Sequence, residues 1–311
     1  MIQTLHVTNG DSVVYLWRKA GLLGTHLAWR DVLHEGPVLP DIPLAELSRV
    51  RAQYLAARGF GNAIKIGHDF EKRDAVISKF ADFEEIVLWF EHDLFDQLQL
   101  LQILDFLGRQ RIAPGFVHAI QTEEFLGMME PTELLALRNR RRPVSAELFE
   151  FARDAWAAFR SSSPQALFEL SKQVPAGFRS MQTGLRRLFE EFPSLDRGVS
   201  RTQLQTLEAV AHGARRDDDL FRVVQAQEDA AFMGDSTFAR QLEDLCAAPA
   251  PLVTRLEDRF ALTPLGERVL RREADWLAVA PLDRWIGGTH LTATDHWRWD
   301  ARRGALVEVT N

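Results

Sequence analysis

Hydrophobic residues follow two different spacings along the first 125 residues of this chain. Short runs rich in β-branched and aromatic residues alternate with longer segments in which apolar positions recur every three or four residues. These patterns predict strands at residues 4–8, 25–29, 85–90 and 115–120, and helices at residues 13–20, 44–58, 69–81 and 94–107. Alternating strands and helices are typical of an α/β domain with a mainly parallel, Rossmann-like sheet. The run at 85–90 is the most apolar, so we expect it to be a central strand.

Helical spacing dominates from about residue 130 onward, and an arginine-rich stretch at 138–143 is expected to mark a boundary. Within residues 200–277, three helices followed by a short hairpin resemble a winged helix-turn-helix. The sequence therefore predicts three segments: an α/β domain at 1–128, a helical connector at 129–195, and a winged-helix-like domain with a C-terminal hairpin at 196–311.

Composition and charge narrow the class of protein. The 311 residues are 46% hydrophobic and 26% charged, as in an ordinary folded protein. With 44 acidic and 37 basic side chains, the net charge of −7 argues against broad adhesion to nucleic acid or anionic membranes. The single cysteine excludes an internal disulfide and multi-cysteine metal sites. The N-terminus lacks the basic start and apolar stretch of a signal peptide, so we expect a cytoplasmic protein without a membrane partner.

Polar side chains gather where three of the expected strands end. The first strand runs into Asn9-Gly10-Asp11-Ser12, the second into a loop with Arg30, Asp31, His34 and Glu35, and the third into Glu91-His92-Asp93. Ligands of open α/β sheets bind beyond the carboxyl ends of the strands, where connecting loops converge. We therefore expect the three turns to line one shared site at one edge of the sheet.

Each side chain in this set has a chemistry that suits such a site. Carboxylates are hard ligands for Mg²⁺ or Mn²⁺, and carboxylate with imidazole can serve as general base and acid. The candidate metal ligands are Asp11, Glu91 and Asp93. The candidate catalytic residues are His92, Glu91, Asp93 and His34. The candidate ligand-binding residues are Asn9, Gly10, Asp11 and Ser12 as an anion cradle, Arg30 as a charge clamp, and Asp31 and Glu35.

Structural roles compete with these functional ones. Asp11 or Ser12 could cap the first helix, and Asp93 could cap the helix that begins at residue 94. His6 lies inside a strand and is expected to be a core residue. The arginines at 138–142 are the best basic patch in the chain, although such a run is usually a solvated segment.

Several well-known signatures are missing from the sequence. It contains no Gly-x-x-x-x-Gly-Lys-Ser/Thr, Gly-x-Gly-x-x-Gly, Gly-x-Ser-x-Gly or His-Glu-x-x-His pattern, which argues against four common enzyme classes. Residues 201–275 carry 10 arginines against 14 acidic side chains, a net charge of −4. DNA-binding modules usually neutralise several phosphates, so nucleic acid is not the favoured partner of the winged-helix-like segment.

Three stretches together carry a family resemblance. His6-Val7-Thr8-Asn9-Gly10-Asp11-Ser12, Trp29-Arg30-Asp31-Val32-Leu33-His34-Glu35-Gly36-Pro37 and Leu88-Trp89-Phe90-Glu91-His92-Asp93-Leu94-Phe95-Asp96-Gln97-Leu98-Gln99 closely resemble the bacterial family catalogued as domain of unknown function 1835. The resemblance covers about residues 1–125, and more loosely the helical remainder. It implies no activity and no catalytic residues.

Two hypotheses about function follow from the residues. The first is an intracellular hydrolase or transferase that acts on a phosphate-bearing or nucleotide-like small molecule, with Mg²⁺ or Mn²⁺ as the cofactor. The second is a non-enzymatic ligand sensor or adaptor whose winged-helix-like region contacts DNA or a partner protein. A metal requirement at the strand ends would favour the first hypothesis.

Overall fold

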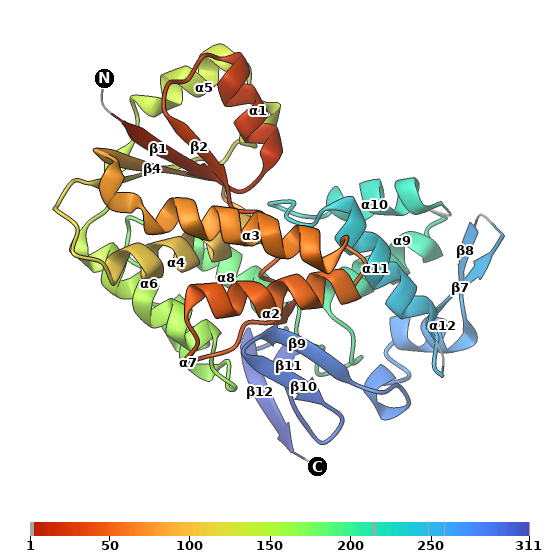
Figure 1. Cartoon of the computed structure of the whole chain (residues 1–311). Coiled ribbons are helices and arrows are strands. Elements are labelled where there is room, and N and C mark those ends of the chain that lie inside the picture. Colours follow the sequence, from red (N-terminus) through yellow and green to blue (C-terminus); the bar gives the residue numbers. More distant parts are fainter. Residues whose placement is uncertain (1–2, 214–215, 248, 258, 311) are drawn as a thin grey trace. The chain divides into compact units, whose positions relative to one another are not determined.

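A mainly parallel sheet forms the framework of the first half of the chain in the computed structural model (Figure 1). The structure describes residues 3–213, 216–247, 249–257 and 259–310. The strand order is β2-β1-β4-β5-β6. The strands are β1 (Thr4–Thr8), β2 (Thr25–Ala28), β4 (Glu85–Phe90), β5 (Val117–Gln121) and β6 (Arg142–Pro143). The first four run parallel, and β6 pairs antiparallel with β5. All six residues of β4 are buried, which confirms the central strand expected from its sequence.

Helices cover both faces of this sheet (Figure 1). On one face lie α1 (Asp11–Lys19) and α5 (Pro131–Arg138), whose apolar side chains pack with Trp89 of β4. On the other lie α3 (Ala63–Ser78) and α4 (Leu94–Gly108). An outer layer consists of α2 (Leu44–Ala57), which packs on α3, and α6 (Ala146–Phe159), which packs on α4.

Helix α4 is buried on nearly its whole circumference because it lies between the sheet and α6. Its buried polar side chains therefore need partners inside the protein. Gln102 accepts a hydrogen bond of 2.7 Å from the indole of Trp29, and Gln99 donates one of 2.9 Å to the carbonyl of Asp31. The helix thus fixes the end of β2 and the loop that follows it.

The chain divides into two units, described separately below. The first comprises Met1–Leu185 and Gly287–Thr289, and the second Arg186–Ile286 and His290–Asn311. These limits do not coincide with the expected boundaries at 128/129 and 195/196. Most of the expected connector packs on the α/β domain, because α6 contributes apolar side chains against α4. The arginine-rich stretch, expected to be a boundary, instead contributes edge strand β6 to the sheet. The remaining connector helices are α7 (Gln165–Ser171) and α8 (Met181–Phe189).

The second unit begins within α8 and continues with three helices. They are α9 (Arg201–Ala211), α10 (Asp217–Gln225) and α11 (Asp235–Cys246), followed by the antiparallel strands β7 (Val253–Leu256) and β8 (Arg259–Leu262). Thr263 then caps α12 (Pro264–Leu270), since its hydroxyl accepts a 3.0 Å hydrogen bond from Gly266 N–H. Strands β11 (Asp295–Asp300) and β12 (Ala305–Thr310) form the C-terminal hairpin that the sequence predicts.

Short strands β9 (Asp283–Gly287) and β10 (Thr289–Thr292) are joined at Gly288. The Gly288 N–H donates to the carbonyl of Phe159 at 2.8 Å. A Cβ at Gly288 would lie only 1.9 Å from the carbonyl oxygen of Arg160, so this close approach requires glycine.

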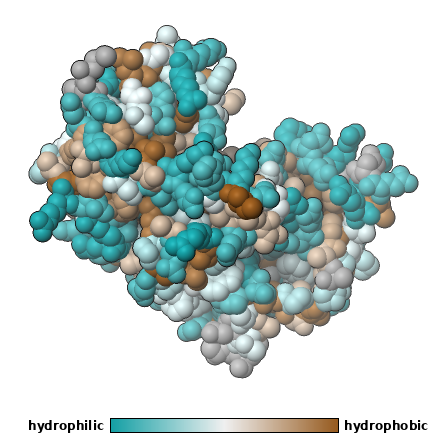
Figure 2. All heavy atoms as spheres, in the orientation of Figure 1, coloured by the Kyte–Doolittle hydropathy of each residue, from teal (hydrophilic) through white to brown (hydrophobic). Residues whose placement is uncertain are grey.

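Hydrophilic residues cover most of the molecular face that Figure 2 draws. The larger exposed apolar side chains, such as Leu23, Ile64 and Met128, come from separate elements. Within the described ranges, no helix is long and apolar enough to cross a membrane.

Candidate functional site

The strand order places a topological switch point at the carboxyl ends of β1 and β4. Strand β2 pairs with β1 on one side, and β4 pairs with β1 on the other side, so the connections that follow these strands leave toward opposite edges of the sheet. Ligand sites of α/β proteins form at such switch points. Asn9 follows β1 and Glu91 follows β4, which places both at this switch point.

Three carboxylates meet there: Glu91, Asp93 and Asp96. One oxygen from each lies within 4.8 Å of the others, and the three residues are only 5%, 4% and 0% exposed. We call them the acidic cluster. The described residues contain no other group of at least three histidine, cysteine or acidic side chains with this spacing.

The start of α4 assembles the acidic cluster. Asp93 is the N-cap, and its carboxylate accepts a hydrogen bond of 3.0 Å from Asp96 N–H. Asp96 accepts hydrogen bonds of 2.5 Å from Glu91 N–H and 2.7 Å from the amide of Asn9. The predicted cap and the predicted site residue are therefore the same side chain, because Asp93 both caps α4 and lies among the three carboxylates.

Glu91 connects the acidic cluster to the loop after β5. Its carboxylate accepts a 2.7 Å hydrogen bond from Leu126 N–H and a further one from Gly127 N–H. A Cβ at Gly127 would meet the Ser12 hydroxyl at 3.4 Å, so this loop also borders the start of α1. Gln97 donates to the Glu91 carbonyl at 2.6 Å, which fixes the backbone of the turn.

Burial and mutual repulsion disfavour ionisation of the acidic cluster. Burial, reinforced by the nearby Asp93, raises the pKa of Glu91 to about 7. Burial likewise raises the pKa of Asp93 to about 7 and that of Asp96 well above its usual value. Among the described residues, no arginine, lysine or histidine forms an ion pair with these three carboxylates. Buried acids without a counter-charge hold protons or bind a cation.

The donor set fits a hard divalent cation. Mg²⁺ binds oxygen at about 2.0–2.1 Å, so opposite ligands lie about 4 Å apart, comparable with the spread of the three carboxylates. A carboxylate oxygen that accepts one hydrogen bond keeps another lone pair for a metal. The three side chains could therefore hold Mg²⁺ or Mn²⁺, with water completing the coordination.

The two predicted acid/base histidines lie beside the start of α4. The ring of His92 packs against Phe125 with centroids 5.3 Å apart. Its Nδ1 is buried and has no hydrogen-bond partner among the described residues. The ring of His34 packs edge-on against Phe95, 6.1 Å away. His92 is thus flanked in the sequence by two acids of the cluster. His34 lies near the same helix only through its contact with Phe95.

Asp31 and Glu35 do not join the acidic cluster, contrary to the expected shared site. Asp31 forms a buried ion pair of 3.0 Å with Arg51. The same guanidinium donates to the carbonyls of Val32 at 2.7 Å and Glu35 at 2.6 Å. Arg51 thus neutralises Asp31 and fixes the loop, which gives Asp31 a structural role.

Asp11, predicted as a metal ligand, is not among the three grouped carboxylates, whereas Asp96 is. Asp11 forms an ion pair of 2.5 Å with Arg30, and their side chains are 67% and 41% exposed. Arg30 therefore has a carboxylate partner, which weakens its expected role as a charge clamp. Gly10 is the N-cap of α1 without a side-chain cap, so neither Asp11 nor Ser12 caps that helix.

Sequence reasoning missed the importance of Asp96 and Gln97. The signal was present in the spacing, because residues three positions apart share a helix face and Asp93 and Asp96 bracket the first turn of α4. A second signal was the polar residues within an otherwise apolar helix, since such residues are expected to be buried with partners.

Comparisons with protein-family models and with curated proteins returned no match. We therefore infer the function from the geometry of the candidate site. The acidic cluster at the switch point between β1 and β4 is the strongest feature of that geometry.

Proposed function

We propose that the first unit is a hydrolase or transferase that acts on a phosphate-bearing small molecule with the help of Mg²⁺ or Mn²⁺. The observation that carries this proposal is the acidic cluster, three buried carboxylates at the switch point of a parallel sheet that form no ion pair within the described part of the chain. Buried charge of one sign costs stability, and such costs are typical of functional sites.

Each neighbouring residue has a role in this proposal. Glu91, Asp93 and Asp96 hold the cation, which would polarise a phosphoryl oxygen and lower the pKa of a bound water. His92 is the proton donor or acceptor, because its imidazole lies between Glu91 and Asp93 in the chain and its buried Nδ1 has no hydrogen-bond partner among the described residues. Asn9 orients Asp96 through its amide, at 2.7 Å.

The strand order and the motifs support a finer assignment of the fold. Parallel strands in the order β2-β1-β4-β5 with helices on both faces support a Rossmann-like domain. The residues that build the site, Asn9 and 91–97, belong to the stretches that resemble the domain of unknown function 1835. We propose membership in that family on this ground.

A second candidate function concerns the second unit. The order α9-α10-α11-β7-β8 favours a winged-helix-like module, and hence the hypothesis of a sensor or adaptor. Three aspartates, 217–219, begin α10, and Arg240 of α11 forms an ion pair with Glu243 at 3.0 Å. These acidic groups favour a protein partner over DNA.

Phosphate-ester hydrolysis with and without Mn²⁺ tests the enzymatic proposal. Wild type should turn over at least one of p-nitrophenyl phosphate, bis-p-nitrophenyl phosphate and the nucleoside triphosphates, and only with the metal. Asp96→Asn should reduce the rate at least a hundredfold, whereas Asp11→Asn should leave it within twofold. Turnover that survives both Asp96→Asn and chelation would contradict the proposal.

A further inference from the structure

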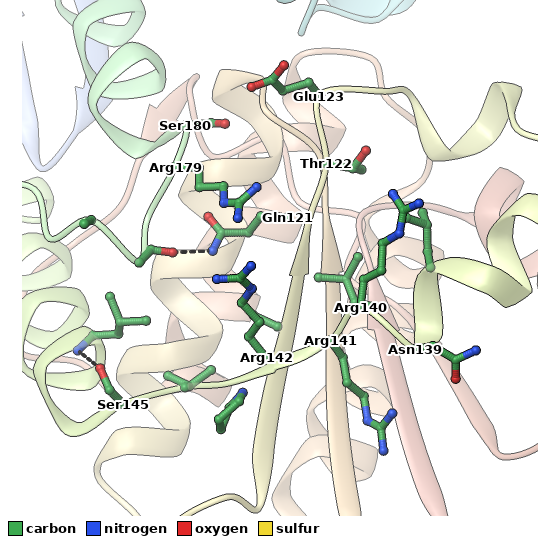
Figure 3. Close-up of a pocket in the computed structure, with 18 of the residues that line it drawn as sticks. Gln121, Thr122, Glu123, Asn139, Arg140, Arg141, Arg142, Ser145, Arg179 and Ser180 are labelled. Carbon is green, nitrogen blue, oxygen red and sulfur yellow. Dashed lines mark hydrogen bonds between the residues drawn. The ribbon is translucent and has the colours of Figure 1, made fainter.

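A large cavity lies beside the sheet edge formed by β5 and β6 (Figure 3). Its volume is about 850 Å³, within the range of about 300–1,000 Å³ typical of small-molecule sites. Its walls come from the end of β5, from residues 139–145 and from the loop at 176–180, all within the first unit.

Three arginines of this cavity lack an acidic partner. Arg140, Arg142 and Arg179 form no ion pair or side-chain hydrogen bond among the described residues. Arg141 differs, because its guanidinium donates to Glu85 at 2.5 Å, and Figure 3 shows it pointing away from Gln121. The three unpaired arginines are named the arginine triad.

The backbone brings the members of the arginine triad together. Arg142 lies in β6, paired with Ala119 of β5. Gln121 of β5 donates a hydrogen bond of 2.7 Å to the Gly177 carbonyl, which ties the loop of Arg179 to the same strand. Figure 3 shows the guanidinium groups of Arg142 and Arg179 on either side of Gln121, and Arg140 beside Thr122.

The rest of the lining is both acidic and apolar. Glu123 and Glu124 also line the cavity, and Figure 3 shows Glu123 apart from the guanidinium groups of Arg142 and Arg179. Apolar side chains of Ile120, Leu137 and Val144 contribute to the wall. A cavity with two guanidinium groups near Gln121, a third beside Thr122 and an apolar wall suits a ligand that carries phosphates on an organic ring.

The cavity borders the strand end that carries the acidic cluster. Thr122, in its wall, donates its N–H to the Phe90 carbonyl at 3.3 Å, one residue before Glu91. Ser180, also in its wall, accepts from Gly184 N–H at 3.0 Å. A Cβ at Gly184 would lie 3.2 Å from Gln97 of α4, so this wall packs on the helix that begins at the cluster.

We propose that the arginine triad binds the phosphate groups of a nucleoside diphosphate or triphosphate. Guanidinium groups bind phosphate oxygens in a bidentate manner, and three of them match a ligand with several negative charges. The assignment of this ligand as the substrate rests on the proposed function, whereas its binding to the cavity does not.

Binding is measured by calorimetry with inorganic pyrophosphate, four nucleoside diphosphates (ADP, GDP, CDP and UDP) and the matching nucleosides, first with a chelator and then with Mn²⁺. Wild type should bind pyrophosphate. At least one nucleoside diphosphate should bind tenfold more tightly than pyrophosphate does, and tenfold more tightly than the nucleoside with the same base. The double variant Arg142→Gln, Arg179→Gln should weaken diphosphate binding at least tenfold. Arg153→Gln, an exposed position on α6 outside the cavity, is the matched control and should not change it.

The outcomes separate this inference from the proposed function. If the double variant no longer binds the diphosphate but binds Mn²⁺ as tightly as wild type does, both the inference and the proposed function are supported. Diphosphate binding that is unchanged in the double variant, or absent in wild type at millimolar concentration, would overturn the inference even if Mn²⁺ binds. A single-stranded oligonucleotide that binds more tightly than every diphosphate would overturn the small-molecule assignment.

Discussion

Two buried clusters of charge, one in each unit, differ in how their carboxylates are balanced. In the first unit the acidic cluster has no cationic partner among the described residues. In the second unit Glu191, 1% exposed, pairs with Arg187 at 2.8 Å and with Arg284 at 3.1 Å. Although burial opposes it, the charges of Arg187 and Arg284 lower the pKa of Glu191 to about 2.

The contrast shows that burial of acids alone does not identify a functional site. Glu191 and Asp96 are equally inaccessible, yet the pKa of Glu191 falls and that of Asp96 rises. A balanced cluster ties elements together, as Arg187 does by also donating to Glu228 at 2.9 Å. An unbalanced cluster leaves a charge for a ligand to neutralise.

The largest effect is expected from breaking the balanced cluster. Arg187→Met leaves Glu191 and Glu228 buried without their shared partner, so the free energy of unfolding should fall by about 3–5 kcal/mol. Its neighbour Arg186 has a 71% exposed side chain, and Arg186→Gln should cost less than about 0.5 kcal/mol. Urea unfolding of both variants checks this, and equal losses would show that the buried network is not stabilising.

The pH dependence of stability should have opposite signs in the two clusters. Raised pKa values mean that folded Glu91 and Asp93 hold protons between about pH 4 and 7 that the unfolded chain has released. Metal-free stability should therefore fall as the pH rises through this window. Glu191, with its lowered pKa, contributes stability that is present above about pH 4.5 and lost toward pH 2.

Urea unfolding at steps between pH 4.5 and 8, in the presence of a chelator, measures the first slope. Asp93→Asn removes one of the acids with a raised pKa and should flatten the decline relative to wild type. An equally steep decline in Asp93→Asn would assign the slope to groups outside the acidic cluster.

The smallest effect is expected at the exposed pair of Asp11 and Arg30. Surface ion pairs contribute about 0–1 kcal/mol, so Asp11→Asn should change the free energy of unfolding by less than about 0.5 kcal/mol. In thermal melting, Mn²⁺ should raise the melting temperature of Asp11→Asn by as much as it raises that of wild type. If Mn²⁺ no longer shifts the melting temperature of Asp11→Asn, Asp11 is a metal ligand after all.

Much of the sheet could be predicted from the sequence. Residues 4–8 form β1 as expected, and the helix expected at 94–107 is α4, because strand and helix periods differ and Asp93 marks a cap. The shared position of the turns after β1 and β4 also follows from parallel strands. These features are set by local spacing and by chain connectivity.

The membership of the site could not be predicted in full. Asp31 is kept out of the acidic cluster by its ion pair with Arg51, which lies 20 residues beyond it in the chain. Arginines 140 and 142 are exposed, as expected of a solvated run, but their spacing in the sequence does not predict that Arg179 of a distant loop lines the same cavity. Such pairings depend on tertiary packing, which periodicity does not encode.

The most direct test of the central claim is Mn²⁺ binding to the metal-free protein at pH 7.5, measured by calorimetry. Wild type and Asp11→Asn should each bind one ion per chain, with dissociation constants within twofold of one another. Asp93→Asn, which keeps a good helix cap, should stay folded and bind at least a hundredfold more weakly. Equal binding by all three proteins would contradict the claim that the acidic cluster is a cation site.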